Sequence, residues 1–174
     1  AWPYVSRHGQ GYSQFEHASH GIALELLQFV PVEDPVKISR LSITNLSGRR
    51  RLLSVTAYVE WALGPSRAAS APFIITERDE KTGAMLARNP WNSEFARRVA
   101  FADFADRQTA WTADRTEFLG RNGTYDRPAA LCQGASLSEK CGAGLDPCAA
   151  LRKTIELRSG ESIQLVFLLG QGDT

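Results

Sequence analysis

Segment 109–120 holds the densest cluster of chemically versatile side chains in this sequence. It contains the indole of Trp111, the carboxylates of Asp114 and Glu117, and the guanidinium of Arg115. An indole face can stack against a sugar ring, and two carboxylates can act as acid and base or nucleophile in glycoside chemistry. The segment is therefore the first candidate for a ligand site.

Two pairs of carboxylates could serve glycoside hydrolysis, namely Asp114 with Glu117 and Asp103 with Asp106. The members of each pair are three positions apart, and residues at that spacing on a β-strand point to opposite faces. Nearby arginines, among them Arg115, favour ordinary surface ion pairs instead. An autonomous glycosidase that uses Asp114 and Glu117 is therefore the weakest of the functions considered.

The histidines and cysteines do not match a metal site or a nucleophilic site. On a strand, His17 and His20 would point to opposite faces, so they do not converge on one ion. Cys132, Cys141 and Cys148 lack the close pairs that are typical of structural zinc sites. The sequence also lacks a phosphate-binding glycine loop, a dinucleotide fingerprint and a Gly-x-Ser-x-Gly motif. We therefore expect no metal site, no cofactor and no catalytic cysteine in this chain.

Three of the tryptophans lie in contexts that distinguish core from surface. Trp61 shares the apolar face of an alternating segment and is expected in the core. Trp91 and Trp111 lie among polar residues, where an indole is available for a sugar ring or a neighbouring domain. The candidates for carbohydrate binding or domain docking are therefore Trp91, Trp111, Asp114, Arg115 and Glu117.

The length and composition indicate one globular domain. The chain has 174 residues, of which 43% are hydrophobic and 22% are charged. Its formal net charge of +1 disfavours a polyanionic partner such as nucleic acid. No apolar run is long enough to cross a bilayer, and three cysteines without a disulfide pattern favour a reducing compartment. Because the sequence lacks an initiator Met, we expect residues 1–174 to be one domain of a longer protein.

Short segments in which apolar and polar residues alternate dominate the chain and predict β-strands. The clearest is 53–61, whose apolar face is formed by Leu53, Val55, Ala57, Val59 and Trp61. Further strands are expected over 22–30, 36–43, 99–104 and 109–119. A phase slip near Arg40 within the second of these predicts a β-bulge. About eight strands are expected in all.

The turns divide these strands into hairpins. Segments 73–76 and 84–87 flank a polar loop and predict one hairpin, and 155–157 and 163–169 predict another that closes the chain. Segment 121–149 is predicted to be a long irregular excursion. Because no amphipathic helix of ten or more residues is recognisable, the predicted fold class is all-β, an antiparallel β-sandwich.

Several motifs together resemble the N-terminal β-sandwich domain of glycoside hydrolase family 94, formerly glycosyltransferase family 36. They lie at 7–15, 29–36, 58–61, 114–120 and 142–148. The likeness is greatest to the phosphorylase-like region of cyclic β-1,2-glucan synthases. The motifs typical of that region are Thr-Glu-x-Asp at 76–79, Thr-Gly-Ala at 82–84 and Ala-Arg-Asn-Pro-Trp-Asn at 87–92. The match extends in order through Phe-Leu-Leu-Gly-Gln at 167–171.

The resemblance implies a β-supersandwich of the galactose-mutarotase type. In that family the catalytic acid and the phosphate site lie in a separate (α/α)6 barrel, so no catalytic residue is transferred to this chain. The resemblance instead implies a non-catalytic, carbohydrate-associated module that binds a β-glucan oligosaccharide and packs on the barrel of its own parent chain. A structural and dimerisation domain without affinity for sugar is the alternative.

The resemblance has three further implications. Family members have additional strands upstream, which leaves open that the sandwich is incomplete at its N-terminus. Unpaired strand edges would favour a homodimer. The parent synthases are similar to inner-membrane proteins that hold this region in the cytoplasm. We expect that the domain itself does not insert into the membrane. We also expect no nucleic-acid partner.

Overall fold

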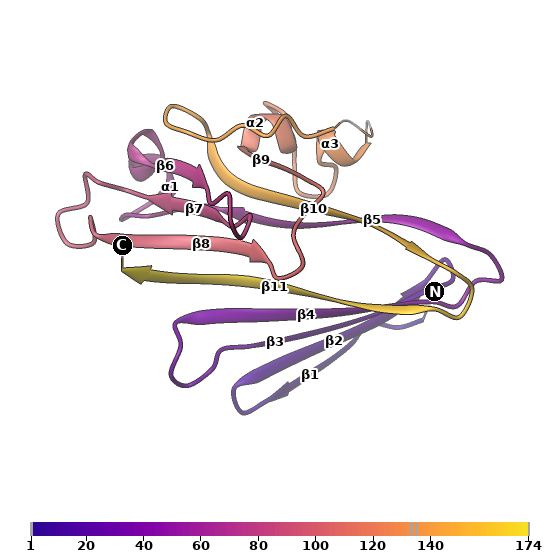
Figure 1. Cartoon of the computed structure of the whole chain (residues 1–174). Helices are drawn as coiled ribbons and strands as arrows, with labels where there is room; N and C mark the ends of the chain where they lie inside the picture. Colours follow the sequence, from indigo (N-terminus) through magenta and orange to yellow (C-terminus); the bar gives the residue numbers. More distant parts are fainter. Residues whose placement is uncertain (1, 133, 135, 174) are drawn as a thin grey trace.

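Two antiparallel β-sheets face each other in the computed structural model, which describes residues 2–132, 134 and 136–173 (Figure 1). The larger sheet has eight strands in the order β1-β2-β3-β4-β11-β8-β7-β6, and the smaller has three in the order β5-β10-β9. This arrangement confirms the predicted antiparallel β-sandwich. No helix among the described residues is long and apolar enough to span a membrane.

The strands of the larger sheet are β1 (Val5–Gly9), β2 (Tyr12–Ser19), β3 (Ile22–Phe29), β4 (Val36–Asn45), β6 (Ile75–Arg78), β7 (Met85–Arg88), β8 (Arg98–Phe104) and β11 (Ser162–Asp173). Those of the smaller sheet are β5 (Arg51–Glu60), β9 (Ala110–Asp114) and β10 (Pro147–Leu157). The helices are α1 (Arg67–Ser70), the 3-10 helix η1 (Ala71–Phe73), α2 (Arg115–Phe118) and α3 (Ala129–Cys132). Sequence reasoning assigned no strand to residues 5–19, where β1 and β2 form a hairpin.

The core lies between the two sheets and follows from the alternation of β5. The side chains predicted for its apolar face, from Leu53 to Trp61, all belong to the core cluster, and Trp61 is 3% exposed. Leu151 of β10 and Ile43 and Leu165 of the larger sheet complete the same cluster. Each large aliphatic side chain buried in this way contributes roughly 1.5–3 kcal/mol, because its apolar area is removed from water.

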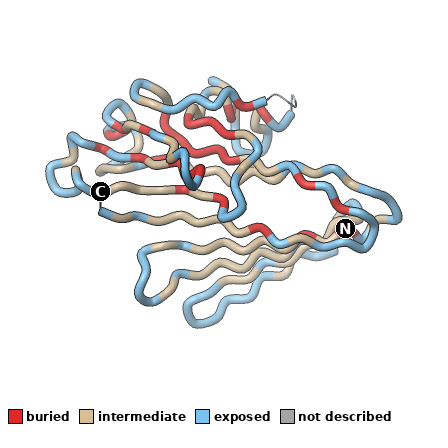
Figure 2. The backbone as a smooth tube through the Cα atoms, viewed as in Figure 1, coloured by how far each residue is buried: buried red, intermediate tan, exposed pale blue. Residues whose placement is uncertain are grey.

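The smaller sheet is covered on its outer face as well. Phe118, Leu119, Ala130 and Leu137 pack there against Cys148 and Ala150 of β10. Figure 2 shows buried residues gathered around β9 and β10, whereas β1, β2 and β3 are mainly intermediate or exposed. A strand buried on both faces needs a continuous apolar run, which explains why Pro147–Leu157 begins without alternation. The predicted irregular excursion over 121–149 therefore ends earlier than expected.

The predicted hairpin at the end of the chain is wrong. β10 pairs with β5 and β9 in the smaller sheet, whereas β11 pairs with β4 and β8 in the larger sheet. The turn after Leu157 thus carries the chain from one sheet to the other. The buried side chain of Asn45 fixes this corner by donating from Nδ2 to the carbonyls of Leu157 and Arg158, both at 3.0 Å.

The bulge predicted near Arg40 is also absent. β4 pairs continuously with β3 and with β11 over its described length, without a shift of register. Leu41 and Ile43 face the core, and Ile38 faces the opposite side of the sheet. The alternation of apolar and polar residues shifts near Arg40 because β4, a regular strand, carries apolar residues on both of its faces. The other predicted hairpin is confirmed, because β6 pairs with β7.

Candidate functional site

Trp91 lies exposed in the loop between β7 and β8, at the end of the sandwich where β11 ends (Figure 1). Its side chain is 77% exposed, and the ring of Phe73 lies beside it with 5.5 Å between ring centroids. Phe73 is itself 41% exposed. We call these two rings the aromatic pair. Large aromatic side chains that gather at a surface indicate a binding or docking site.

A buried amide holds the loop that carries Trp91. The side chain of Asn89 is 7% exposed; its Nδ2 donates to the carbonyl of Leu63 at 2.7 Å, and its Oδ1 accepts from the backbone N–H of Trp91 at 3.1 Å. Asn92 Oδ1 then accepts from the backbone N–H groups of Glu94 and Phe95, both at 3.0 Å. Asparagine stabilises turns in this way, so the Asn-Pro-Trp-Asn sequence fixes the backbone beneath the exposed indole.

A groove of about 700 Å³ adjoins this loop. Its polar and aromatic lining includes Asn92, Ser93, Glu94, Phe95, Arg98 and Gln171. Arg98 also forms an exposed ion pair with Asp173 at 3.4 Å. Sugars are bound by an aromatic face together with carboxylate, amide or guanidinium groups that pair with hydroxyls. The aromatic pair and this groove together supply both kinds of group.

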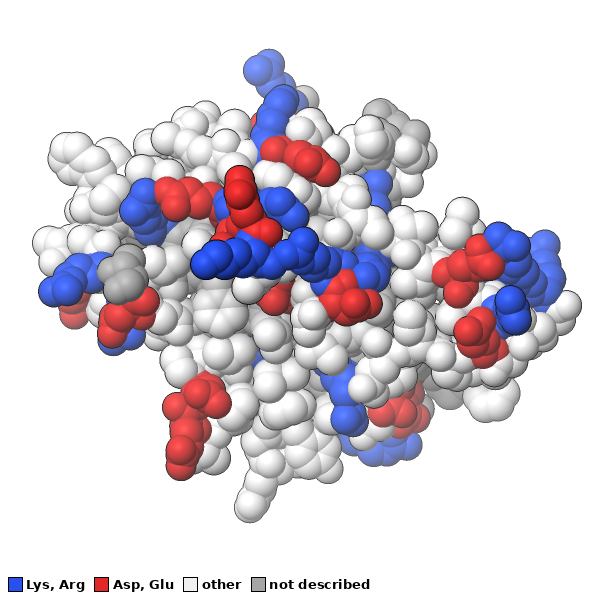
Figure 3. Space-filling model, in the orientation of Figure 1, with Lys and Arg blue, Asp and Glu red and all other residues white. Residues whose placement is uncertain are grey.

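The charged side chains on the face that Figure 3 shows do not suggest a polyanionic ligand. Figure 3 shows acidic and basic side chains intermixed over the face in view, without a large region of one sign. The formal net charge of the chain is +1. Long-range attraction of a polyanion needs a coherent field, which this distribution does not provide on that face.

Trp111, the other candidate indole, lies in the core. It is 6% exposed, stands opposite Leu151 of β10, and has the guanidinium carbon of Arg78 5.5 Å from its ring centroid. The cation can interact with the negative face of the indole. The face that a sugar ring would need is therefore occupied by the protein itself.

The strand predicted over 109–119 ends earlier than expected, at Asp114. The Asp114 carboxylate accepts from the backbone N–H of Thr116 at 2.9 Å and caps α2. Aspartate is a favoured cap because it satisfies a helix N–H that has no partner within the helix. Asp114 and Glu117 are therefore related by a helical turn, and the expectation that they point to opposite faces of one strand is wrong.

Glu117 is tied into the fold by hydrogen bonds. Its carboxylate accepts from the hydroxyl of Thr112, and from the backbone N–H and the hydroxyl of Ser138 at 2.6 and 2.7 Å. Burial raises the pKa of Glu117, but these hydrogen bonds outweigh burial and hold the pKa below its ordinary value. Because Glu117 is held as an anion, it is better suited to link β9 to the segment that contains Ser138 than to act as a proton donor.

Arg115 belongs to an ion-pair network that sequence reasoning missed. Its Nε lies 2.8 Å from Glu60 Oε1, and Arg67 Nε lies 2.9 Å from Glu60 Oε2. Asp146 contacts both Arg67 and Arg115. The network joins three separate segments of the sequence, one with Glu60 and Arg67, one with Arg115 and one with Asp146, so no local pattern could have revealed it. Each carboxylate faces both cations, and the network joins β5, α1 and α2.

Two phenols complete the environment of Glu60. The hydroxyls of Tyr58 and Tyr125 donate to Glu60 Oε1 at 2.8 and 3.0 Å. Burial raises the pKa of Glu60, but the hydrogen bonds from Tyr58, Arg115 and Tyr125 together outweigh it and leave the pKa lowered. Burial, with the hydrogen bond to Glu60, raises the pKa of Tyr58. Glu60 is thus held as an anion whose oxygens are already occupied.

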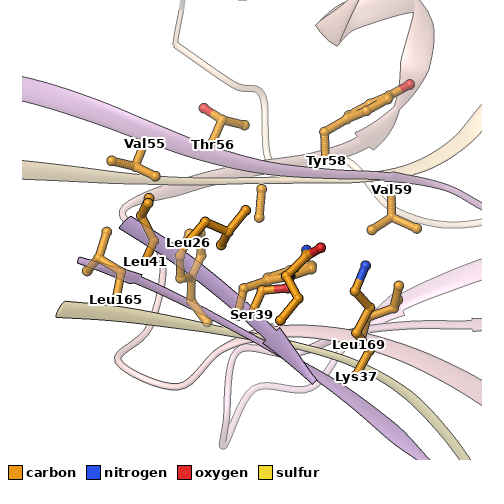
Figure 4. Close-up of a pocket in the computed structure, with 14 residues that line it drawn as sticks. Leu26, Lys37, Ser39, Leu41, Val55, Thr56, Tyr58, Val59, Leu165 and Leu169 are labelled. Carbon is orange, nitrogen blue, oxygen red and sulfur yellow. Dashed lines mark hydrogen bonds between the residues drawn. The ribbon is translucent and has the colours of Figure 1, made fainter. Parts of the chain in front are cut away.

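A second hollow, of about 320 Å³, lies between the sheets beside β5. Leu26, Leu41 and Leu165 line it, and Val59 points into it from β5 while Tyr58 points away (Figure 4). Its walls are mainly apolar, which suits aliphatic side chains better than the hydroxyls of a sugar.

Metal and thiol chemistry find no support in the described part of the chain. No group of three or more His, Cys, Asp or Glu side chains lies close enough there to hold a metal ion. Cys132 and Cys141 are exposed and free, and Cys148 is buried and free. Burial raises the pKa of the Cys148 thiol, which disfavours the reactive thiolate.

The chain is similar to known proteins over its whole length. A family model described as the supersandwich domain of glycosyl hydrolase 94 matches residues 1–174. The cyclic beta-(1,2)-glucan synthase NdvB of Rhizobium meliloti (strain 1021) is 37% identical over 170 residues, which are 98% of this chain and 6% of the synthase. The solabiose phosphorylase of Paenibacillus borealis is 30% identical over 175 residues, which are 98% of this chain and 22% of the phosphorylase.

Solved structures show the same fold at low sequence identity. A protein from Escherichia coli K12, assigned provisionally as an aldose 1-epimerase, is 10% identical with a TM-score of 0.56 over 98% of this chain and 69% of its own. A polysaccharide lyase is 11% identical with a TM-score of 0.56 over 92% of this chain and 21% of its own. With the family model matching every residue, the chain belongs to the supersandwich domains of glycosyl hydrolase 94.

Proposed function

We propose that this domain is a non-catalytic module that binds a β-glucan oligosaccharide at the aromatic pair. The observation that carries the proposal is the exposed Trp91, held against Phe73 and beside a groove with polar walls. An exposed indole is energetically unfavourable in water unless a partner covers it, and the face of a pyranose is a suitable partner. Among the five candidate residues of the sequence, sugar contact is proposed for Trp91 alone.

The carboxylates support a role without catalysis. Asp114 caps a helix, Glu117 is held by Thr112 and Ser138, and Glu60 is held by ion pairs and phenols. General acid catalysis needs a carboxyl whose pKa is raised toward the working pH, whereas the pKa values of Glu60 and Glu117 are lowered. The chain belongs to an enzyme family, and we assign the chemistry to another part of the parent protein.

The same proposal places the domain on a separate catalytic barrel within a longer chain. The chain spans 22% of the length of the phosphorylase and 6% of that of the synthase, so most of each relative lies outside the matched region. Free cysteines without disulfide partners support the cytoplasm as the compartment. From the similarity to a cyclic glucan synthase, we also propose that the parent protein is held at the inner membrane.

Sugar titration tests the proposal. Short β-1,2-linked gluco-oligosaccharides are added to the purified 174-residue chain while tryptophan fluorescence and amide chemical shifts are recorded. We expect saturable binding in the millimolar range, with shifts centred on Trp91 and the groove residues. In Trp91→Ala the dissociation constant should rise about tenfold or more. Trp2→Ala is the matched control, because Trp2 is also exposed and its backbone N–H donates to Ala18 of β2, which lies near the other edge of the larger sheet from β7.

The outcomes separate the proposal from its alternative. Binding that survives in Trp91→Ala would move the sugar site elsewhere on the domain. If no saturable change occurs at millimolar sugar, the domain has no affinity for glucan and the structural and dimerisation role replaces the proposal. Hydrolysis or phosphorolysis by the chain, lost in Asp114→Asn, would instead contradict its assignment as non-catalytic.

A further inference from the structure

The loop between β7 and β8 carries a second exposed ring in addition to Trp91. Phe95 lies four residues further along the chain, is 53% exposed and lines the groove of about 700 Å³. Trp91 stands outside that lining and instead meets Phe73, with 5.5 Å between ring centroids. A phenyl ring, like an indole, offers an apolar face to the C–H groups of a sugar ring. The loop therefore presents two aromatic surfaces, the aromatic pair outside the groove and Phe95 within it.

Side-chain amides fix the spacing between these two surfaces. Asn89 lines the groove, donates from Nδ2 to the carbonyl of Leu63 at 2.7 Å, and accepts from the backbone N–H of Trp91 at Oδ1. Asn92 donates its backbone N–H to the carbonyl of Asn89 at 3.2 Å, and its Oδ1 accepts from the backbone N–H of Phe95 at 3.0 Å. The backbones that carry the two rings thus belong to one hydrogen-bonded set of turns, so a ligand needs to order little of the protein when it binds.

Segment 62–65, another wall of the groove, is packed against the segment that holds Phe73. A Cβ added at Gly64 would stand 2.9 Å from the Cβ of Ser70 and 3.8 Å from Nδ2 of Asn89. Ser70 is 2% exposed and ends α1, and η1 follows it and ends at Phe73. Because glycine permits this close approach, the groove wall, the loop and the support of Phe73 form one packed unit.

The size and the polar lining of the groove favour a neutral ligand larger than one sugar ring. The lining holds one acidic and one basic side chain, Glu94 and Arg98, whose formal charges cancel. Arg98 also faces Asp173 at 3.4 Å, whereas recognition of an anion relies on cations that are free to pair with it. The amides of Asn92 and Gln171 add donors and acceptors for hydroxyls. Sites for drug-sized ligands have volumes of about 300–1,000 Å³, so about 700 Å³ leaves room for more than one ring.

We propose that the site takes a neutral glucan chain of several units, with one unit stacked on the aromatic pair and another lying in the groove over Phe95. This inference rests on the proposed function, which assigns sugar contact to Trp91, and it adds the length and the charge of the ligand. Because one packed unit holds both surfaces, the second contact needs little further ordering of the protein. A chain that reaches both surfaces should therefore bind more tightly than a single unit.

Sugars of increasing length test the inference on the purified 174-residue chain. Glucose, the β-1,2-linked disaccharide and longer β-1,2-linked gluco-oligosaccharides are titrated while amide chemical shifts are recorded. We expect the longer sugars to bind about tenfold more tightly than glucose. Phe95→Leu, which keeps an apolar side chain without a ring, should remove this gain and leave the affinity for glucose within about twofold. Phe95→Tyr, which keeps the ring, is the matched control and should retain the gain.

Failure of this inference is distinguishable from failure of the proposed function. If no sugar gives saturable shifts, both fail. If glucose and the longer sugars bind equally, and Trp91→Ala weakens both, the proposed function stands and the longer site is overturned. A gain with length that survives in Phe95→Leu would also overturn it, because the second unit would then lie elsewhere. Tighter binding of glucose 1-phosphate than of glucose would overturn the assignment of a neutral ligand.

Discussion

Segment 109–120 and the loop between β7 and β8 carry similar side chains in opposite environments. Each contains a tryptophan and acidic and basic residues. In the first, the indole of Trp111 is 6% exposed, and Asp114, Arg115 and Glu117 bind the backbone, side-chain hydroxyls or charged residues outside the segment. In the second, the indole of Trp91 is 77% exposed beside a groove. The same residue types therefore build a wall of the core in one place and a candidate binding surface in the other.

The difference comes from the neighbours of each segment. β9 pairs with β10, and α2 and the residues around Leu137 cover the outer face of the smaller sheet, so Trp111 has partners on its strand and across the core. The β7–β8 loop follows the end of β7, and the buried side chain of Asn89 anchors it to the carbonyl of Leu63. A candidate site is thus indicated where a fixed backbone presents a side chain that stays mostly exposed, with Phe73 beside only part of its ring.

The strongest test of this contrast is removal of the buried indole. Trp111→Ala should lower the free energy of unfolding by about 3–5 kcal/mol, because it leaves a cavity in the core and removes the partner of Arg78. Urea denaturation followed by circular dichroism measures the change. Trp111→Phe, which keeps an aromatic ring, is the control and should lose less. A loss below about 1 kcal/mol for the alanine variant would show that Trp111 is not a core residue.

The second test breaks the hydrogen bonds of Glu117. Glu117→Ala should cost about 1–3 kcal/mol, since the hydroxyl of Thr112 and the backbone N–H of Ser138 lose their acceptor. The same denaturation experiment applies. Glu80→Ala, at an exposed turn position, should change stability by less than about 0.5 kcal/mol. An equal effect of the two variants would contradict the structural role of Glu117.

The third test uses pH. The pKa values of Glu60 and Glu117 are lowered in the folded chain, so their contribution to stability is fully present above the unfolded-state pKa of about 4.3. It is lost as the pH falls through the folded-state values. Stability measured at a series of pH values should therefore fall steeply below about pH 4.3. A Glu117→Gln variant should show a shallower fall; an unchanged slope would mean that Glu117 is not held as an anion.

The smallest effect is expected at the exposed indole. Trp91→Ala should change the free energy of unfolding by no more than about 0.5 kcal/mol, because few core contacts are lost. Differential scanning calorimetry can measure the melting temperature with sufficient precision. A large destabilisation would show that Trp91 supports the fold as Trp111 does, which would contradict the distinction between a core indole and a surface indole.

Sequence reasoning recovered the parts of the fold that depend on local alternation. β5 was predicted with the correct inward face, and the β6–β7 hairpin with nearly correct limits. It failed where one local signal has two tertiary outcomes. The turn after Leu157 could return a strand to its own sheet or carry it to the other, and its residues do not distinguish these possibilities. Strand β1 and its partner β2 were missed because the Gly-rich segment between them suggested turns alone.

The sequence by itself determined the fold class and the family, because periodicity and extended motifs are properties of the chain order. It also identified Trp91 and Trp111 as candidates without separating them. Only the tertiary structure decided which indole reaches solvent, and it alone assembled Glu60, Arg67, Arg115 and Asp146 into one network. The physical reason is that burial and ion pairing depend on strands and loops that are distant in the sequence and meet only when the two sheets pack.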